Sequence, residues 1–327
     1  MQAFEYANPS TLQEALPLLS AKWGDADILA GGTDLISLMK DYLHTPKRLV
    51  NIKGIKELEG ISKTADGLRI GALVTMDELA NSADVKAGYN SLAQAAAGIP
   101  SPQIRHMGTV GGDLCQRPRC WYYRQGMGLL GMKDGKSLIP DGENRYHSIF
   151  GDGPAHFVSA SSLGPALVAL GAKVKLVSAK GPREVPVAQF FRAPKDENTR
   201  EIVLQPNEIL TEIVVPAAAN VRTSTYEVRQ KEALDWPLVA ASVALTMNGN
   251  TVTAAKIVLG HVAPTPVESA RAEAALKGKT ISAATAEAAG KAAVAGAKPL
   301  SQNAYKVTLA KVAVKRALLD AAKAAKA

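Results

Sequence analysis

Two short glycine-rich segments constrain this chain more than any other feature. One reads Ala30-Gly-Gly-Thr-Asp-Leu35 and the other Ile104-Arg-His-Met-Gly-Thr-Val-Gly-Gly-Asp-Leu114, so each sets a glycine pair near a threonine and before an aspartate. Adjacent glycines allow consecutive backbone N–H groups to converge on an anion, because no Cβ blocks the approach. A Gly-Gly turn alone is common, but two with matching threonine and aspartate indicate a cradle for the two phosphates of one dinucleotide.

The composition is typical of a globular protein in a reducing compartment of the cell. The 327 residues are 47% hydrophobic, which suggests roughly two domains of about 150 residues. No apolar run approaches the ~20 residues that span a bilayer, and the N-terminus does not read as a signal peptide. Cys115 and Cys120 are too few for a disulfide framework. We therefore expect a cytoplasmic protein without membrane insertion, periplasmic only if a signal-bearing partner exports it.

The net charge of +8 raises the alternative of nucleic-acid binding. Many lysines are spread through alanine-rich segments in the last quarter of the chain, and only 5% of residues are aromatic, so platforms for base stacking are scarce. The charge is typical of a solvated helix face or a surface for an acidic partner. We expect no nucleic acid.

Hydrophobic periodicity predicts an α+β chain in three parts. Residues 1–55 form a first subdomain, 56–218 a second with an irregular insertion at about 115–158, and 221–327 a C-terminal domain. Capping-box spacings start helices at Thr11–Glu14 and Thr75–Glu78. The expected helices are 7–20, 34–43, 75 onward, 89–97, 165–170, 267–276, 283–295 and 304–324. The expected strands are 27–30, 48–52, 68–73, 173–177, 202–204, 210–215, 226–229, 238–247 (with helix possible in its middle) and 253–262.

The insertion contains two sequence patterns whose surroundings do not support the function that each pattern would suggest. Gly126-Met-Gly-Leu-Leu-Gly131 matches GxGxxG by letter, but no βαβ unit surrounds it. Cys115 and Cys120 could bind zinc with His147 and His156, which leaves a zinc-bearing structural subunit as an alternative. No serine or cysteine stands in a nucleophile elbow, so we expect no catalytic residue and no metal site.

Four segments resemble one family, in the same order along the chain. They are Ala30–Leu35, Ile104–Asp113, Ser161–Ala172 and Tyr226–Ala244. The family is the FAD-binding (medium) subunits of the xanthine dehydrogenase, carbon monoxide dehydrogenase and aldehyde oxidoreductase type of molybdenum hydroxylase. The chain looks most similar to the subunits of bacterial aldehyde and purine oxidoreductases. The resemblance implies an FAD-binding domain of the vanillyl-alcohol oxidase (PCMH) type followed by a C-terminal domain like that of the CO dehydrogenase flavoprotein.

The resemblance also implies a set of FAD-binding residues. The first turn would wrap the diphosphate, the second would form a wall near ribityl and phosphate, and a serine pair would touch the cofactor. Ile209 would pack by the flavin ring, and Arg229, or Lys231 in its place, would favour reduced, anionic flavin. The residues are Leu29, Ala30, Gly31, Gly32, Thr33, Asp34, Leu35, Gly108, Thr109, Gly111, Gly112, Asp113, Ser161, Ser162, Ile209 and Arg229.

Three departures from the family pattern matter. Asp113 stands where the family usually has asparagine, and a carboxylate only accepts hydrogen bonds, so it would repel a phosphate but suit a ribityl hydroxyl. Ser162 stands where aspartate is usual. Some relatives carry a four-cysteine iron–sulfur insertion after the second motif, whereas Cys115 and Cys120 are the only cysteines of this chain. The sequence therefore predicts no such cluster.

The resemblance implies one subunit of a larger oxidoreductase. A molybdopterin-containing large subunit would oxidise the substrate, and a small [2Fe–2S] subunit would pass electrons to FAD. NAD, oxygen or a quinone would be the final acceptor. The segment Trp121–Arg124 is the candidate for lining the partner interface or covering FAD. The alternatives are a standalone FAD-dependent oxidoreductase of the same fold, for which His106 is the one candidate base, and a non-catalytic nucleotide- or nucleic-acid-binding module.

Overall fold

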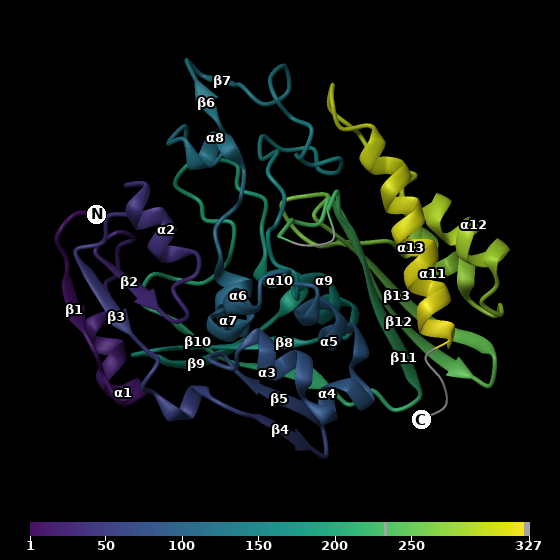
Figure 1. Cartoon of the computed structure of the whole chain (residues 1–327), viewed down its shortest axis with the longest axis horizontal. Coiled ribbons are helices and arrows are strands. Elements are labelled where there is room, and N and C mark those ends of the chain that lie inside the picture. Colours follow the sequence, from purple (N-terminus) through teal and green to yellow (C-terminus); the bar gives the residue numbers. More distant parts are fainter. Residues whose placement is uncertain (232–233, 324–327) are drawn as a thin grey trace.

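A computed structural model describes residues 1–231 and 234–323. Three sheets, each with its own helices, follow one another along the long axis of the molecule in chain order (Figure 1). The insertion projects from the central part and carries a small fourth sheet. No helix in the described ranges is both long and apolar enough to cross a membrane.

The first sheet is parallel and has the order β1-β3-β2. Its strands pack on a small core that includes Ala15, Val50 and Ile55. The carboxyl end of β2 leads directly into the first glycine turn, and ligands commonly bind at the carboxyl ends of parallel strands. The elements are β1 (Glu5–Ala7), α1 (Leu12–Ala15), the 3₁₀ turn η1 (Leu16–Leu18), β2 (Ala26–Leu29), α2 (Leu35–Lys40) and β3 (Arg48–Asn51).

The central sheet is antiparallel, with the order β4-β5-β10-β8-β9. Helices cover the face of this sheet that looks toward the insertion (Figure 1). The elements are η2 (Lys56–Leu58), β4 (Ile61–Thr64), β5 (Gly67–Gly71), α3 (Met76–Asn81), α4 (Ala83–Gly88), α5 (Asn90–Ala97), α6 (Pro102–Met107), α7 (Val110–Cys115), α9 (Gly164–Ala169), β8 (Lys173–Ser178), β9 (Gly181–Pro186), α10 (Val187–Phe190) and β10 (Ile209–Pro216). The insertion adds α8 (Trp121–Arg124) and the hairpin of β6 (Met132–Lys133) and β7 (Lys136–Ser137).

The third sheet is antiparallel and lies between two layers of helices. One face packs on the C-terminal helices around Val243, Leu245 and Val314. The other face meets α5, where the Ser91 N–H donates to the Thr223 hydroxyl at 3.1 Å. The C-terminal part is therefore fixed against the central part. Its elements are β11 (Val221–Val228), β12 (Val239–Asn248), β13 (Thr251–Gly260), β14 (Val267–Glu268), α11 (Ala270–Leu276), α12 (Ala283–Ala293) and α13 (Tyr305–Lys323).

The structure corrects several expected elements. The helix expected over 7–20 is one turn plus η1, because Pro17 has no N–H to continue the α-helical ladder. Its capping box is half formed, since the Glu14 carboxylate bonds Ser10 instead of the Thr11 N–H. The expected strand 202–204 is wrong, because Ile202 makes only an isolated bridge.

Other elements are longer, shorter or of another type than expected. The strand expected over 238–247 runs over Val239–Asn248 without any helix, and Val267 begins a short strand before α11. The second glycine segment is not a simple turn, because α6 and α7 frame it. The capping box at Thr75 and Glu78 is confirmed at α3. The expected helix end at residue 324 lies outside the described residues.

Candidate cofactor-binding site

One cavity of about 530 Å³ collects most of the predicted residues. Its walls come from the first glycine turn and α2, from α6, α7 and the start of β10, and from the segment after β11. Every residue predicted to bind FAD lines it except Leu29 and Ser161. The tertiary structure thus gathers segments that lie up to 200 positions apart in the sequence.

The first glycine turn needs both of its glycines, for different reasons. A Cβ on Gly31 would lie 2.7 Å from the Met107 carbonyl carbon and still closer to its oxygen, so only glycine lets this loop touch the end of α6. Gly32 has φ +73°, in the left-handed region that disfavours residues with a side chain. The two glycine motifs therefore lie in direct contact.

The backbone N–H groups of this first turn are free to bind an anion. Those of Gly31, Gly32, Thr33 and Asp34 donate to no acceptor in residues 1–231 and 234–323. Gly31, Gly32 and Asp34 are half-buried and Thr33 is exposed. Half-buried N–H groups normally find a partner, so free donors at Gly31, Gly32 and Asp34 beside a cavity favour an anionic ligand.

The N–H groups of the second glycine pair are already used. Gly111 donates to the Ala72 carbonyl at 2.9 Å, and Gly112 donates to the Thr109 hydroxyl that caps α7, at 3.1 Å. The expectation that both pairs present free amides is therefore wrong for the second. Gly111 instead permits close packing, since a Cβ there would lie 2.9 Å from the Ala72 Cβ.

Asp113 faces the protein rather than a phosphate. Its buried carboxylate accepts hydrogen bonds from the Ser161 hydroxyl at 2.5 Å, the Ser162 N–H at 3.1 Å and the Leu163 N–H at 3.0 Å. Burial raises the pKa of this carboxyl, and the hydrogen bonds oppose that rise. An acceptor-only group suits a site surrounded by donors. Asp113 therefore fixes the serine pair against α7.

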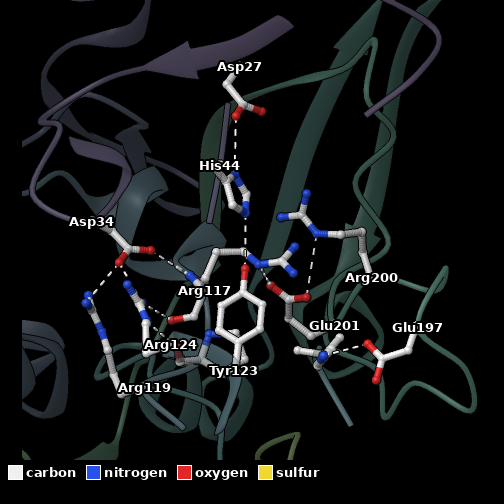
Figure 2. A network of polar contacts seen from close by, with 12 residues as sticks. Asp27, Asp34, His44, Arg117, Arg119, Tyr123, Arg124, Glu197, Arg200 and Glu201 are labelled. Atoms are coloured by element: carbon white, nitrogen blue, oxygen red, sulfur yellow. Dashed lines mark hydrogen bonds and ion pairs between the residues drawn. The ribbon is translucent and has the colours of Figure 1, made fainter. Parts of the chain in front are cut away.

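Asp34 ties the first turn to the insertion. Figure 2 shows its carboxylate facing the backbone of Arg117 and the side chains of Arg119 and Arg124. The distances are 2.8 Å to the Arg117 N–H, 2.9 Å to Arg119 and 2.8 Å to Arg124. These partners occupy the carboxylate, so the contribution of Asp34 to a ligand comes from its backbone.

A second polar chain runs beside this one in Figure 2. Asp27 contacts His44 at 3.3 Å, and His44 contacts the buried Tyr123 hydroxyl at 3.1 Å. Glu201 lies 3.2 Å from Arg117 and 3.6 Å from Arg200. Tyr123 belongs to the segment Trp121–Arg124 that the sequence analysis singled out. Sequence reasoning missed the other residues, because isolated polar and charged residues give no periodic or motif signal.

Arg229 lines the cavity, but its charge is partly balanced. Its guanidinium donates to the Gly98 carbonyl and to the Glu227 carboxylate. Burial raises the pKa of Glu227 to about 7, although the positive charge of Arg229 lowers it. Lys231, the alternative source of charge, is exposed and outside the cavity lining.

The remaining walls are apolar, as a planar ring system requires. The apolar residues that line the cavity include Ile52, Ala72, Met76, Leu204, Ile209 and Leu210. Free amides at one place and apolar walls at another suit a ligand with an anionic segment and a flat apolar ring.

Residues 2–218 match the family model described as "FAD binding domain in molybdopterin dehydrogenase". The chain belongs to this family. Residues 224–321 match the model of the CO dehydrogenase flavoprotein C-terminal domain.

Relatives and solved structures agree along nearly the whole chain. The chain is 32% identical to the carbon monoxide dehydrogenase medium chain of Hydrogenophaga pseudoflava, over 96% of both chains. It is 29% identical to the aldehyde oxidoreductase FAD-binding subunit of Escherichia coli (strain K12), over 98% of this chain and 99% of the relative. A solved carbon monoxide dehydrogenase of H. pseudoflava, described as lacking the Mo-pyranopterin moiety, matches with TM-score 0.77, 31% identity and 99% coverage of both chains. The identities to the carbon monoxide dehydrogenase and the aldehyde oxidoreductase subunits are nearly equal, so they do not indicate which substrate the complex of this chain oxidises.

FAD, the cofactor of this family, fits the cavity. The free amides of residues 31–34 match the diphosphate, which carries two negative charges, and backbone N–H groups bind such a group without a lysine. The apolar walls match the ring. The family and the geometry therefore point to the same cofactor.

The insertion is held together by side-chain packing. Leu129, Leu130, Ala155 and Phe157 form a small apolar cluster, with Cys120 at its edge. Of the residues suggested for zinc, Cys120 contacts His147 at 3.1 Å. No group of three or more metal-ligating side chains occurs in the part of the chain that the structure describes. The geometry gives no support to the zinc alternative.

Proposed function

We propose that the chain holds FAD with its diphosphate on the N–H groups of residues 31–34 and its ring among the apolar walls near Ile209. The observation that carries this assignment is the run of four free N–H donors at the carboxyl end of β2, facing a cavity that is otherwise mostly apolar. Bound FAD exchanges electrons one or two at a time. The residues of this chain bind it, orient it and exclude water from it.

The predicted site residues take different roles within this proposal. Gly31, Gly32, Thr33 and Asp34 supply backbone donors, and Ala30, Leu35 and Leu29 position that turn. Gly108, Thr109, Gly111 and Gly112 build the facing wall. Asp113 orders Ser161 and Ser162, and of these two only Ser162 lines the cavity. Arg229 favours negative charge on the reduced ring, to a degree set by Glu227.

The insertion covers the site in this proposal. Arg117 and Arg119 both line the cavity, and both contact Asp34. The segment Trp121–Arg124, which follows them in the sequence, forms α8. An insertion anchored to the phosphate-binding turn would order that turn and slow the exchange of FAD with solvent.

The chain serves as the electron-transfer subunit of a molybdenum hydroxylase, by analogy with its relatives. These relatives are a carbon monoxide dehydrogenase medium chain and an aldehyde oxidoreductase FAD-binding subunit. The partners would be a molybdopterin-containing large subunit and a [2Fe–2S] small subunit, and the acceptor would be NAD, oxygen or a quinone. The FAD-binding parts would be residues 1–55 and 56–218, and the C-terminal domain 221–327.

An absorption spectrum of the purified chain tests the cofactor assignment. Flavin bands near ~450 nm and about one released FAD per chain are expected. A chain that stays colourless after incubation with FAD would overturn the proposal. Bleaching of the flavin by an aldehyde or purine in the absence of any partner would instead indicate a standalone oxidoreductase.

A further inference from the structure

The GxGxxG-like segment of the insertion has a geometry that the FAD assignment leaves unexplained. All three of its glycines have positive φ, +82° at Gly126, +74° at Gly128 and +61° at Gly131. Backbone in such conformations can turn successive N–H groups to one side and form a nest that binds an anion. The side chains of Leu129 and Leu130 are buried in the apolar cluster of the insertion, so their backbone is held in place.

A carboxylate from another part of the chain occupies this nest. The N–H groups of Leu129 and Leu130 donate to the two carboxylate oxygens of Glu197, at 2.5 Å and 2.8 Å. The contact depends on Gly128, because a Cβ there would lie 2.7 Å from the carboxyl carbon of Glu197. Glu197 is exposed, so water can hydrate its carboxylate when the contact breaks. The contact is therefore specific but reversible.

Glu197 lies near the tip of a closed loop, residues 192–201. The residues on either side of the loop, Phe191 and Ile202, are joined by a β-bridge. Within the loop, the Asp196 carboxylate accepts from the N–H groups of the second and third residues after it, both at 2.9 Å. Compact loops of this kind have close ends and internal packing. Loop 192–201 can therefore swing about its base as a unit.

The same loop forms part of the wall of the FAD cavity. Arg200 lines the cavity, and its guanidinium stacks over the ring of Trp23 at 4.2 Å from the ring centroid. Trp23 also lines the cavity and belongs to the first subdomain. The loop thus connects the first subdomain to the insertion. When the loop swings outward, Arg200 leaves Trp23 and this side of the cavity opens.

The closed position of the loop has an unfavourable feature next to its base. Glu201 is only 5% exposed, and Figure 2 shows its carboxylate facing Arg117 and Arg200. The ion-pair distances are 3.2 Å and 3.6 Å, but within the described residues neither oxygen accepts a hydrogen bond of normal geometry. A buried carboxylate without hydrogen bonds is costly. Opening of the loop would hydrate Glu201, so the closed position depends on the contact at the tip.

We propose that loop 192–201 is a gate for FAD and that Glu197, bound in the glycine nest, is the latch that holds the gate shut. The inference rests on the proposed function, since the gated ligand is FAD. Glu197 does not line the cavity, so it is a positioning residue that acts through the loop. The loop contains no helix or strand and few buried side chains, and such segments open at the lowest free energy.

The rates at which FAD binds and is released test the gate. Stopped-flow fluorescence of the full chain measures binding after mixing with FAD and release after dilution. Glu197→Ala removes the latch, and Gly128→Ala displaces the Glu197 carboxylate from the nest. Each change should raise both rates about tenfold, because two hydrogen bonds to a carboxylate are lost. The latch holds the loop shut with or without FAD, so the Kd should change by less than about threefold.

Gly126→Ala is the matched control. Gly126 has a positive φ like Gly128, so alanine adds similar backbone strain, but a Cβ at Gly126 would meet only Leu43 Cδ2, at 3.9 Å. The control should bind and release FAD at the rates of the unmodified chain. A chain with both Glu197→Ala and Gly128→Ala should behave like Glu197→Ala alone, because both changes break the same contact.

Two outcomes with folded, FAD-binding protein would overturn the inference. One is a pair of rates in both variants that matches Gly126→Ala. The other is faster release with an unchanged binding rate, because Glu197 would then stabilise only the FAD-bound form. An unmodified chain that binds no FAD would count against the proposed function instead. Hydrogen exchange of the FAD-free chain would still test the latch: both variants should exchange faster over residues 192–201 than Gly126→Ala, and equal exchange would refute it.

Discussion

Replacing Gly31 by alanine is the sharpest perturbation of the proposed FAD site. The added Cβ would lie 2.7 Å from the Met107 carbonyl carbon and 3.2 Å from the Gly108 Cα. Carbon atoms prefer separations of about 3.5–4.0 Å, so the turn would have to move by roughly 1 Å. Both obstructing groups belong to the backbone, so they cannot rotate away as a side chain would.

The expected loss follows from the donors that move with the turn. A hydrogen bond to a charged group contributes about 1.5–3 kcal/mol, and a shift of this size would break one or two of those from residues 31–34 to the diphosphate. A loss of about 3 kcal/mol corresponds to roughly 100-fold weaker FAD binding. The stability of the chain without FAD should fall less, by about 1–3 kcal/mol.

Fluorescence titration of the FAD-free chain with FAD measures this loss. Gly54→Ala is the matched control, since Gly54 also lies in a turn of the first part, has no positive φ, and its added Cβ would meet nothing nearer than 3.9 Å. The control should bind FAD like the unmodified chain. If folded Gly31→Ala protein binds FAD within threefold of the control, the first turn does not hold the diphosphate.

Three further changes probe the surroundings of the site. Asp34→Asn removes the partner of two half-buried arginines and should lower the free energy of unfolding by about 2 kcal/mol in urea, with faster proteolysis of the insertion; an unchanged urea midpoint would show that these ion pairs contribute nothing. Asp113→Ala leaves the N–H groups of Ser162 and Leu163 buried without an acceptor and should cost about 3 kcal/mol, more than Asp113→Asn, in thermal unfolding; equal melting temperatures for the two variants would contradict this role. Glu227 has a pKa of about 7 in the folded protein, against an ordinary value of 4.5, so the folded state binds a proton that the unfolded state releases between these pH values. The free energy of unfolding should therefore fall as pH rises from about 4.5 to 7. The expected fall is roughly 3 kcal/mol relative to the variant Glu227→Gln, which does not titrate. Parallel stability curves for the two proteins over this range would refute the assignment.

The insertion is ordered by side-chain contacts rather than by long helices or strands. The segment has few regular elements, yet it is anchored at one end by Asp34 and at the other by hydrogen bonds such as that from Asn144 to Ser301, at 2.9 Å. Its apolar cluster around Leu129 and Phe157 completes the packing. The insertion therefore has its own reasons to be ordered, and it links the FAD cavity to the C-terminal part.

Much of this protein could be predicted from local patterns. The glycine motifs, the capping box at Thr75 and Glu78 and the alternation in β5 each depend on residues a few positions apart, so the sequence displays them directly. The predicted elements were wrong where contacts with residues far away in the sequence decide whether a strand forms. Residues 202–204 have strand-like composition but no neighbouring strand to pair with beyond one bridge, so they stay irregular.

The sequence by itself determined the family, the cofactor and nearly all the segments that surround it, because glycine pairs and their neighbours act through local backbone geometry. Only the tertiary structure decided how those residues are used. It assigned the N–H groups of Gly111 and Gly112 to Ala72 and Thr109, the carboxylate of Asp113 to residues 161–163, and that of Asp34 to the insertion 83–90 positions away. A buried hydrogen-bonding group pairs with a partner that folding brings near, and the residues next to the group in the sequence do not indicate which partner that is.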